Sequence, residues 1–506
     1  MTLFQNKPAP NNQQLLGSNS KKDRKDATSK DLGITAHKAE DFSEWYTQVV
    51  TKAQLADYSS AKGFMVLMPY GFSIWEKIKE YFDRRIKETG HSNAYFPLLI
   101  PERLLKKETE HFAGFTPEVF WVTHSGDTEL AERLAVRPTS ETIIYESYSK
   151  WIKSWRDLPL LINVWNSVVR AEITSTKPFI RTTEFLWQEG HTVHATEEDA
   201  EKEVMYILDL YRQLVEEQLA IPVFVGKKTE QEKFKGAVYT TTLEAIIPDG
   251  KALQMGTSHH LGQKFAKPFE IKYLGKDEVE HFAWTTSWGI SWRLIGASIM
   301  IHGDDRGLVL PPRIAPIQVV LVPIFYKEAD KEKILSEVKS LSKSLESRGI
   351  RTFIDDREQY TPGWKYHEWE MKGVPLRVEL GPRDVQSGQV TIVRRDTGDR
   401  VAIARGDSEK RIVDLLDNLQ ESMFQKAKRL KEELTSKASD MGAFRKILDQ
   451  RGGFIEAFLC EEACELKIKE ETGATVRVVP FDQSENGECL YCHSPSAKRV
   501  YFARSY

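Results

Sequence analysis

The stretch RAEITSTKPFIRTTEFLWQEGH, residues 170–191, carries more chemistry than any other part of this 506-residue chain. Arg170 and Glu172 come first, then Arg181 and Glu184, and both arginines lie in apolar surroundings. An unpaired cation in such surroundings is costly, whereas guanidinium groups paired with carboxylates suit a bidentate grip on phosphate. The alternative is a pair of hairpin strands with a salt-bridged face. We favour a functional, phosphate-binding segment.

The composition is that of an ordinary soluble protein. The net charge of −3 argues against a strongly basic nucleic-acid coat and leaves a local basic patch open. No apolar run approaches the ~20 residues of a membrane span, and the first 26 residues have neither a signal core nor a transit-peptide pattern. All four cysteines lie beyond residue 459, so no disulfide framework supports the bulk of the chain. We expect a cytoplasmic protein with no membrane segment.

The sequence pattern divides the chain into a polar arm and three folded units. The arm covers residues 1–33, and the units cover residues 34–314, 315–406 and 407–506. Strand patterns dominate the middle third without strict strand–helix alternation, which predicts an antiparallel sheet with flanking helices. After the segment LVLPPRIAP, strands and helices alternate, which predicts a separate small α/β domain. A helix with an apolar face from Ile412 to Leu434 leads into a cysteine-bearing module.

The segment before the arginines combines a helix with two expected strands. Residues 71–89 have apolar side chains at helical spacing, and FMVLMPYG, residues 64–71, reads as a short buried strand. NAYFPLLIP, residues 93–101, reads as a strand that contains Pro97. Proline cannot donate to a strand ladder, so this strand belongs at a sheet edge or at an interface. This helix and the strand that follows it suit the interface of a dimer, and simple placement of the strand at a sheet edge fits equally well.

Two further segments carry candidate site residues. In RPTSE, residues 137–141, a hydroxyl precedes a carboxylate by two positions, which suits binding of a small amine or capping of a helix. QMGTSHHLG, residues 254–262, reads as a small-residue loop that is either a metal site or a core turn. Arg293 heads an apolar helical run. The glycine-rich phosphate motifs GxxxxGK[ST] and GxGxxG are absent, so phosphate must be held by arginine side chains.

The cysteines form two pairs near the C-terminus. Cys460 and Cys464 have three residues between them, and Cys489 and Cys492 have two. Such pairs outside an oxidising compartment favour a tetrahedral zinc site over disulfides. Four buried, reduced thiols are the alternative, and His493 is a competing ligand.

Together these segments resemble motifs 1, 2 and 3 of the class II aminoacyl-tRNA synthetases. RPTSE, RTTEFLWQEGH, GTSHHLG and GDDRGLVLPPR are closely similar to the prolyl-tRNA synthetase family of the eukaryote/archaeal type, from about residue 36 to residue 506. The resemblance implies an α+β fold with three parts. These are a class II antiparallel catalytic sheet with flanking helices, an α/β anticodon-binding domain, and a small C-terminal α/β zinc-binding-like domain. It also implies a homodimer formed through residues 71–101.

The resemblance assigns roles to named residues. Those implied to bind L-proline are Thr139, Glu141, Arg170 and His259, with Phe115, Trp187 and His191 around the ring. Those implied to bind ATP are Arg170, Glu172, Arg181, Thr182, Gln254, Thr257, Ser291 and Arg293. Arg170 and Arg293 are the implied catalytic residues, at the α- and γ-phosphates. Mg²⁺ is implied between the phosphates, with Glu172 as a protein contact, and Cys460, Cys464, Cys489 and Cys492 are the possible structural Zn²⁺ ligands. Trp292 departs from the smaller residue expected beside Arg293.

The implied activity is that of a proline–tRNA ligase, which forms prolyl-adenylate and transfers proline to tRNA(Pro). About 60 residues separate His191 from Gln254, which leaves no room for the large editing domain that bacterial-type relatives insert there. Another synthetase of the same subgroup is one alternative. The other is a catalytically inactive paralogue acting as a tRNA-binding or regulatory scaffold, although such relatives usually lose motif arginines.

The resemblance also extends to the last two domains. Residues 355–384 resemble the anticodon-reading segment. Its candidate cations and stacking faces for bases are Arg357, Lys365, Lys372 and Arg377, beside Tyr360, Trp364 and Trp369. The chain ends at Tyr506, which matches the terminal tyrosine of the family. The carboxylate of that tyrosine is implied to approach the active site.

Overall fold

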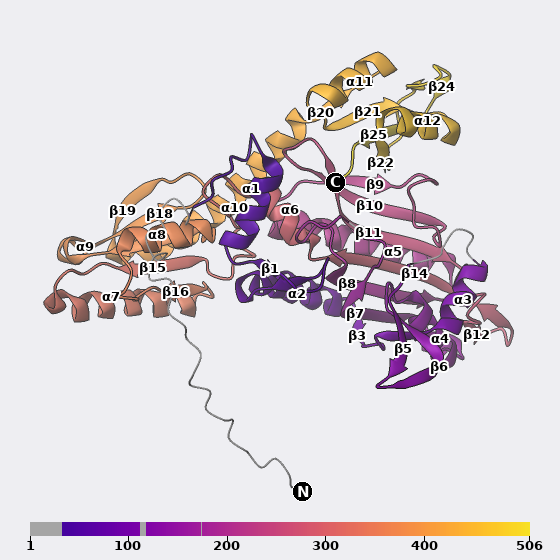
Figure 1. Cartoon of the computed structure of the whole chain (residues 1–506), viewed down its shortest axis with the longest axis horizontal. Helices are drawn as coiled ribbons and strands as arrows, with labels where there is room; N and C mark the ends of the chain where they lie inside the picture. Colours follow the sequence, from indigo (N-terminus) through magenta and orange to yellow (C-terminus); the bar gives the residue numbers. More distant parts are fainter. Residues whose placement is uncertain (1–32, 112–117, 174) are drawn as a thin grey trace, which may run out of the picture.

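The computed structural model describes residues 33–111, 118–173 and 175–506. Figure 1 shows a large sheet with its helices, an α/β domain beside it in orange, and the C-terminal module in yellow over one edge of the sheet. Within the described residues, no helix is both long enough and apolar enough to cross a membrane.

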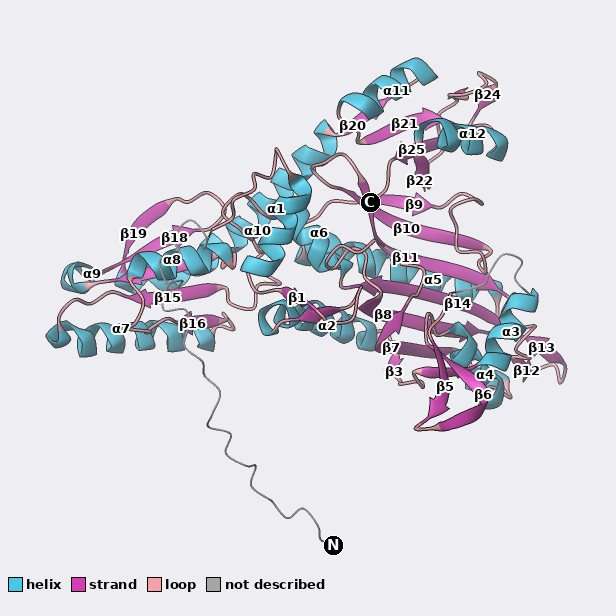
Figure 2. Cartoon of the chain, in the orientation of Figure 1, coloured by secondary structure: helices cyan, strands magenta, loops and turns pink. Residues whose placement is uncertain are grey.

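The central sheet has eleven strands in the order β20-β21-β25-β22-β9-β10-β11-β14-β8-β7-β3. Its catalytic part is β3 (Ser92–Asn93), β7 (Leu160–Val169), β8 (Glu184–His194), β9 (Phe224–Lys227), β10 (Tyr239–Ile246), β11 (Ala252–Gly262) and β14 (Trp284–Ser291). From β9 to β7 each strand is antiparallel to its neighbour, and only β3 is parallel to β7. The antiparallel sheet with flanking helices is confirmed (Figure 2).

Several helices cover this sheet. The helices of the first domain are α1 (Phe42–Lys52), α2 (Pro69–Glu88), α3 (Glu102–His111), α4 (Glu141–Trp151), η1 (Trp155–Asp157), α5 (Glu197–Gln213), the π-helical turn η2 (Leu214–Gln218) and α6 (Arg293–His302). Among them, α5 and α6 pack directly on β11 and β14. The Thr196 hydroxyl accepts a hydrogen bond from the Asp199 N–H at 3.2 Å and so caps α5. Val204, Ile207 and Tyr211 are buried on the inner face of α5, and this burial holds α5 on the sheet.

Small sheets complete the first domain. They consist of β1 (Ala56–Tyr58) with β2 (Met65–Leu67), β4 (Leu99–Pro101) with β6 (Thr128–Val136) and β5 (Trp121–Ser125), and β12 (Lys272–Leu274) with β13 (Glu280–Phe282).

The two strands expected before the arginine segment differ from the prediction. The strand expected at residues 64–71 is only three residues long and partly exposed, because Pro69 begins α2. The strand expected at residues 93–101 is two short strands, β3 and β4, and Pro97 lies in neither. β3 pairs with β7 and β4 with β6, so the chain passes from one sheet to another at the residue that cannot donate to a ladder.

The loop expected at residues 254–262 is also wrong, because these residues lie in β11. β11 is enclosed between β10 and β14. Its small and polar side chains resemble a loop in composition, yet Ser258 and His260 are fully buried.

The second domain is built on a five-stranded sheet in the order β16-β15-β17-β18-β19. Its elements are β15 (Val319–Pro323), α7 (Glu328–Ser347), β16 (Thr352–Ile354), α8 (Pro362–Met371), β17 (Leu376–Leu380), α9 (Pro382–Ser387), β18 (Gln389–Arg394), β19 (Arg400–Ala404) and η3 (Arg405–Asp407). α10 (Ser408–Glu433) follows, and its Ile412, Leu415 and Leu419 share a core with this sheet. The predicted alternation of strands and helices is confirmed, with α9 and β19 as additions.

The C-terminal module joins the catalytic sheet directly. It comprises β20 (Thr435–Lys437), α11 (Met441–Gln450), β21 (Phe454–Phe458), α12 (Glu462–Thr472), β22 (Thr475–Pro480), β23 (Gly487–Glu488), β24 (Pro495–Ser496) and β25 (Arg499–Ala503). β22 is antiparallel to β9, with Val479 opposite Lys227. A Cβ on Gly226 would lie 2.2 Å from the Val479 carbonyl oxygen, so glycine is needed for this close approach. The module is therefore tied to the catalytic domain.

Candidate active site

A cavity of about 330 Å³ opens on one face of the catalytic sheet. Most of the predicted site residues line it, namely Thr139, Glu141, Arg170, Trp187, His191, Gln254, Thr257, His259, Ser291 and Arg293. A smaller adjoining cavity is lined by Arg170, Arg181, Thr182, Ser291 and Arg293. Residues from four separate segments of the sequence thus meet at one place.

One predicted residue of the described part of the chain lies outside both cavities, and another cannot be placed. Glu172 is exposed and lines neither of them, although its charge acts on Arg170. Phe115 lies outside the described residues. Trp292 is buried and packs edge-to-face on Phe179, with ring centroids 5.7 Å apart, while Ser291 still lines both cavities.

Strand register explains why the β10 and β11 residues converge. Thr240 lies opposite His259, and Thr242 opposite Thr257, so alternate residues of both strands share the face that carries the cavity. The His259 ring nitrogens lie 2.9 Å from the Thr240 hydroxyl and 3.0 Å from the Thr257 hydroxyl. Burial, followed by the charge of His191, lowers the pKa of His259 to about 3, so the ring is neutral near pH 7.

Arg170 and Arg293 are the two arginines that line the main cavity. Arg170 lies against the rings of Phe185 and Trp187, and its Nε donates to the Pro138 carbonyl at 3.4 Å. The Nε of Arg293 donates to the Ile180 carbonyl at 3.4 Å. Burial and then the charge of Arg170 lower the pKa of Arg293 to about 10, which leaves it protonated at pH 7.

Neither of these guanidinium groups forms an ion pair with a carboxylate in the part of the chain that the structure describes. A buried cation without an anion is costly. Two such cations on one cavity therefore make a site for a ligand that carries negative charge.

The other end of the cavity is built on β8 and the start of α4. The Thr139 hydroxyl donates a short hydrogen bond to Glu141. The His191 Nε2 lies 3.0 Å from the Glu189 carboxylate, which also accepts hydrogen bonds from Ser140 and Asn166. Burial lowers the pKa of His191, but the hydrogen bond and charge of Glu189 outweigh it and raise that pKa overall.

Sequence reasoning missed several residues of the cavity wall. Glu189 is not among the predicted site residues, although its two-residue spacing from His191 puts both side chains on one face of a strand. Lys228, Glu232, Lys233 and Phe234, which follow β9, also line the cavity. Their segment KKTEQEKFKG is so rich in charge that it reads as a solvated loop, and no local signal would have assigned it to the site.

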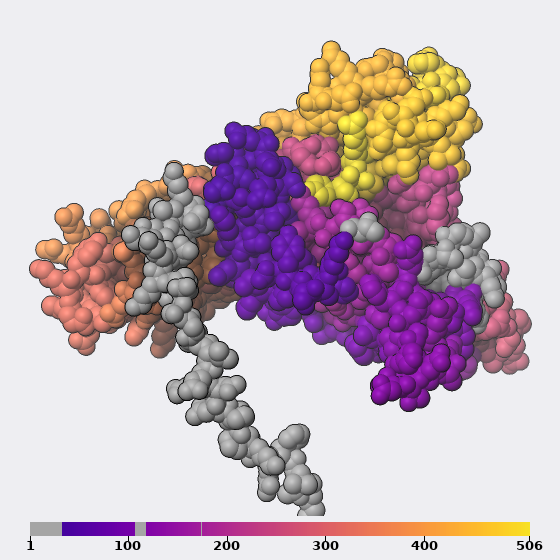
Figure 3. All heavy atoms as spheres, in the orientation of Figure 1, coloured from indigo at the N-terminus to yellow at the C-terminus, as the bar shows by residue number. Residues whose placement is uncertain are grey.

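The C-terminal end of the chain reaches the connection between β7 and β8. The Ala252 N–H donates to the Arg504 carbonyl at 2.8 Å, and the Tyr506 N–H donates to the Ala252 carbonyl at 3.1 Å. The Lys177 ammonium donates a hydrogen bond to the Tyr506 hydroxyl. Figure 3 shows the yellow C-terminal segment against the magenta surface of the catalytic domain. The side-chain contact between Tyr506 and the β7–β8 connection is made by the phenol of Tyr506.

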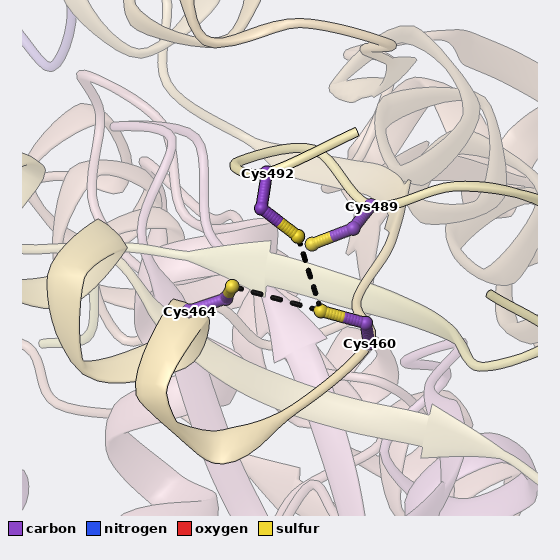
Figure 4. A group of neighbouring side chains, drawn as sticks. All are labelled: Cys460, Cys464, Cys489 and Cys492. Atoms are coloured by element: carbon purple, nitrogen blue, oxygen red, sulfur yellow. Dashed lines mark hydrogen bonds between the residues drawn. The ribbon is translucent and has the colours of Figure 1, made fainter. Parts of the chain in front are cut away.

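The four cysteines gather in the C-terminal module, as Figure 4 shows. Their sulfur atoms all lie within 4.8 Å of one another. Burial raises the pKa of Cys460 to about 11, whereas hydrogen bonds from Ser494 lower that of Cys492 to about 6. Four sulfur donors at this separation fit the tetrahedral coordination of Zn²⁺.

Three family models match the chain. They are "tRNA synthetase class II core domain (G, H, P, S and T)" at residues 120–302, "Anticodon binding domain" at residues 318–415, and "Prolyl-tRNA synthetase, C-terminal" at residues 441–506. The three matches follow the order of the three domains described above.

Similar proteins cover nearly the whole chain. The chain is 56% identical to a proline–tRNA ligase of Cenarchaeum symbiosum, over 94% of this chain and 100% of that protein. It is 54% identical to one from Natranaerobius thermophilus, over 92% of this chain and 97% of that protein. The crystal structure of prolyl-tRNA synthetase from Cryptosporidium parvum, complexed with halofuginone and AMPPNP, matches with a TM-score of 0.89 and 43% identity, over 94% of this chain and 100% of that one. This chain belongs to the prolyl-tRNA synthetase family of the class II aminoacyl-tRNA synthetases.

Proposed function

We propose that this chain activates L-proline with ATP to prolyl-adenylate and transfers the prolyl group to tRNA(Pro). The observation that carries the proposal is the pair of half-buried guanidinium groups, Arg170 and Arg293, which face one cavity without an ion-pair partner among the described residues. A substrate with an anionic carboxylate and a polyphosphate supplies the missing negative charge. Membership of the family supports the same substrates.

The end of the cavity with acid, hydroxyl and aromatic groups suits proline. Glu141 and Thr139 would hold the ammonium group of the imino acid, and Arg170 its carboxylate. Trp187 and His191 would enclose the ring, together with His259, whose neutral imidazole is polar without adding charge. Phe115, the third expected wall, lies outside the described residues.

ATP would occupy the part of the cavity between β11, β14 and the β7–β8 connection. Gln254, Thr257, Thr182 and Ser291 offer amide and hydroxyl contacts there, and Arg181 reaches it from the exposed side. A carboxylate oxygen of proline attacks the α-phosphorus in line, and pyrophosphate leaves. The attacking group is already ionised, so the protein needs no general base, and catalysis consists of positioning and charge stabilisation. Arg170 lies at the carboxylate and α-phosphate, and Arg293 at the γ-phosphate.

Metal ions complete the proposal. Mg²⁺ prefers one or two carboxylates plus phosphate oxygens, and the exposed carboxylate of Glu172, close enough to act on Arg170, fits that role. Bound Mg²⁺ would neutralise charge between the phosphates. A structural Zn²⁺ at Cys460, Cys464, Cys489 and Cys492 would hold the C-terminal module together. We place the protein in the cytoplasm, where such thiols stay reduced.

The second domain would read the anticodon of tRNA(Pro). Tyr360 and Trp364 are stacked with their rings 3.8 Å apart, and the Arg357 guanidinium lies 4.9 Å from the Tyr360 ring. These partly exposed groups suit stacking of unpaired bases. Lys365 and Trp369 are buried and bound to Asp355, so they belong to the core of the domain.

A homodimer is part of the same proposal. Between α2 and β7 lies a cavity of about 820 Å³, lined in part by Phe72, Tyr95 and Leu98. These side chains are 42%, 74% and 41% exposed, and a grouped apolar surface of this kind marks an interaction site. It falls within residues 71–101, the segment expected at the dimer seam.

Charging of tRNA(Pro) with labelled proline by the purified chain tests the proposal. Prolyl-tRNA that depends on ATP and on this protein is the expected product. The alternative of an inactive scaffold expects binding of tRNA(Pro) without any charging. The described residues between His191 and Gln254 form the end of β8, α5, η2, β9, β10 and the start of β11, which all belong to the catalytic sheet or its covering helix; this supports a chain without an editing domain.

A further inference from the structure

A buried ionic cluster lies where the C-terminal module meets the catalytic sheet. Glu244 on β10 is fully buried and binds two cations, Lys228 of the catalytic domain and Arg477 of β22. The Lys228 Nζ lies 2.6 Å from Glu244 Oε1. Arg477 donates from Nη2 to both carboxylate oxygens, at 3.1 and 3.0 Å, and from Nε at 3.2 Å. The charges of the two cations outweigh the effect of burial and keep the pKa of Glu244 low.

The cluster is part of the wall of the candidate active site. Lys228 lines the main cavity, and so does Glu232, whose carboxylate lies 3.9 Å from Arg477 Nη1. Lys228 also donates to the backbone carbonyl of Arg477 at 3.0 Å. Arg477 itself is not among the residues that line the cavity. It contacts two residues that do line it, Lys228 and Glu232.

The cluster is also linked to the proposed ATP contacts through the sheet. Glu244 is the cross-strand partner of Gln254, directly after an irregularity in the β10–β11 register. The ladder is locally disrupted at this point, and the Glu244 side chain is held there by Lys228 and Arg477. Glu244 and Arg477 also act on the pKa of Arg293, in opposite directions, which indicates that their charges are felt at the proposed γ-phosphate contact.

A purely structural interface would not need this arrangement. Replacing a buried ion pair with apolar residues is often neutral or stabilising, so the cluster contributes little to stability by itself. Lys228 and Arg477 face the carboxylates of Glu244 and Glu232. A change at Arg477 therefore alters the charge balance behind the wall of a cavity that is suited to a polyphosphate.

We propose that Arg477 is a positioning residue for ATP, which acts through Glu244 and Lys228, so that the C-terminal module completes the nucleotide side of the active site. This inference rests on the proposed function, because it assumes that ATP occupies the cavity. Arg477 holds Lys228 and the β10 residue opposite Gln254, and it adds positive charge where the phosphates bind.

The test is proline-dependent ATP–pyrophosphate exchange by the full chain, with ATP and proline varied separately. Arg477→Met should raise the KM for ATP about tenfold, the change expected when one charge-assisted contact is lost. The KM for proline and kcat should change less than about threefold, because none of Arg477, Glu244 and Lys228 is among the proposed proline contacts. Arg477→Lys, which retains the charge and loses the planar fork, should recover most of the affinity for ATP.

Glu465→Ala is the matched control. Glu465 is a buried residue of α12 that accepts a hydrogen bond from Thr229 across the same interface, and neither residue lines the cavity. This variant should lower the melting temperature and leave the KM for ATP unchanged. If Arg477→Met does not fold, Lys228→Met makes the same test from the cavity side, with the same selective rise in KM for ATP.

An Arg477→Met protein whose KM for ATP stays within twofold of the wild type would overturn the inference. So would equal rises in KM for ATP and proline, or a rise of the same size in Glu465→Ala. Absence of proline-dependent exchange in the wild-type protein would instead contradict the proposed function, so the two failures are distinguishable.

Discussion

Lys177 and Tyr506 are in contact although 329 positions separate them in the sequence. The Lys177 ammonium donates to the Tyr506 hydroxyl, and it lies 4.7, 5.1 and 5.8 Å from the rings of Tyr506, Tyr46 and Phe42. Lys177 belongs to the connection that carries Arg181, and the two residues are joined by backbone hydrogen bonds. The end of the chain therefore helps to fix the segment that we assign to ATP binding.

Removal of this contact should impair adenylate formation more than folding. We expect deletion of Ser505 and Tyr506, and to a lesser degree Tyr506→Phe, to lower kcat/KM for ATP by about tenfold, the loss of one charge-assisted contact. The melting temperature should fall by no more than a few degrees. Tyr491→Phe, which removes a tyrosine hydroxyl bound to Glu471 at the surface, is the control. Unchanged exchange kinetics in the deletion variant would show that Ser505 and Tyr506 take no part in adenylate formation.

Arg170→Ala should abolish prolyl-adenylate formation and leave the fold intact. The guanidinium would contact both reacting groups, and the loss of one such electrostatic contact costs about 10²–10³ in rate. Arg103→Ala, which breaks an exposed ion pair with Glu132, should exchange pyrophosphate normally. Near-normal exchange by a folded Arg170→Ala protein would remove Arg170 from the site.

His302 should make the protein less stable in acid. It is buried at the end of α6 with its Nε2 2.8 Å from the Leu219 carbonyl, and burial lowers its pKa from 6.5 to about 4. In the unfolded chain the ring binds a proton below pH 6.5, so the stability contributed by the neutral ring is complete above that pH and lost as the pH falls toward 4.

Between pH 7 and pH 5 this loss amounts to about 2 kcal/mol for His302. Urea unfolding at the two pH values checks this expectation, with His302→Gln as the variant that retains a donor but does not titrate. The pH dependence should be smaller in His302→Gln by about that amount. An identical pH dependence in both proteins would contradict the assignment.

Metal removal should act on the C-terminal module. Modification of the thiols in purified protein should release one equivalent of zinc per chain, since the four sulfur atoms form a single site. A Cys460→Ser/Cys489→Ser protein should contain no zinc and should melt at a lower temperature, because metal binding contributes to folding. Wild-type protein that is fully folded and free of zinc would leave the cysteines as reduced core residues.

The chain should activate alanine weakly and should not correct the error. A site shaped for proline also admits alanine, because each missing methylene costs only about 1–3 kcal/mol of discrimination. We expect alanine-dependent pyrophosphate exchange far below that with proline, and no hydrolysis of added alanyl-tRNA(Pro). Rapid deacylation by the purified protein would contradict a chain without an editing domain.

Periodicity predicted the elements whose packing is local. α2 and α10 lie where apolar spacing indicates, because the apolar face of each is buried along most of its length. The sequence did not predict β11 as a strand, because its glycines, serine and histidines are residue types that are common in loops. Its neighbours β10 and β14 override that preference by supplying both ladders of hydrogen bonds.

Site residues that belong to a recognisable motif could be predicted from the sequence, whereas those that only the folded chain brings together could not. Arg170, His259 and Arg293 could be named because each lies in a recognisable segment. The role of Lys228 and Arg477 depends on β22 pairing with β9, about 250 residues earlier in the chain. No local pattern encodes that pairing, so the contribution of the C-terminal module to the cavity wall emerges only in the folded protein.

The measurement that tests the central claim most directly is pyrophosphate exchange by the wild-type protein with each of the twenty amino acids in turn. Proline should support exchange at the highest rate, alanine at a low rate, and glycine, threonine, serine and histidine at background. Exchange that depends on another amino acid of this subgroup, or no exchange with any of them, would contradict the assignment of the cavity to proline and ATP.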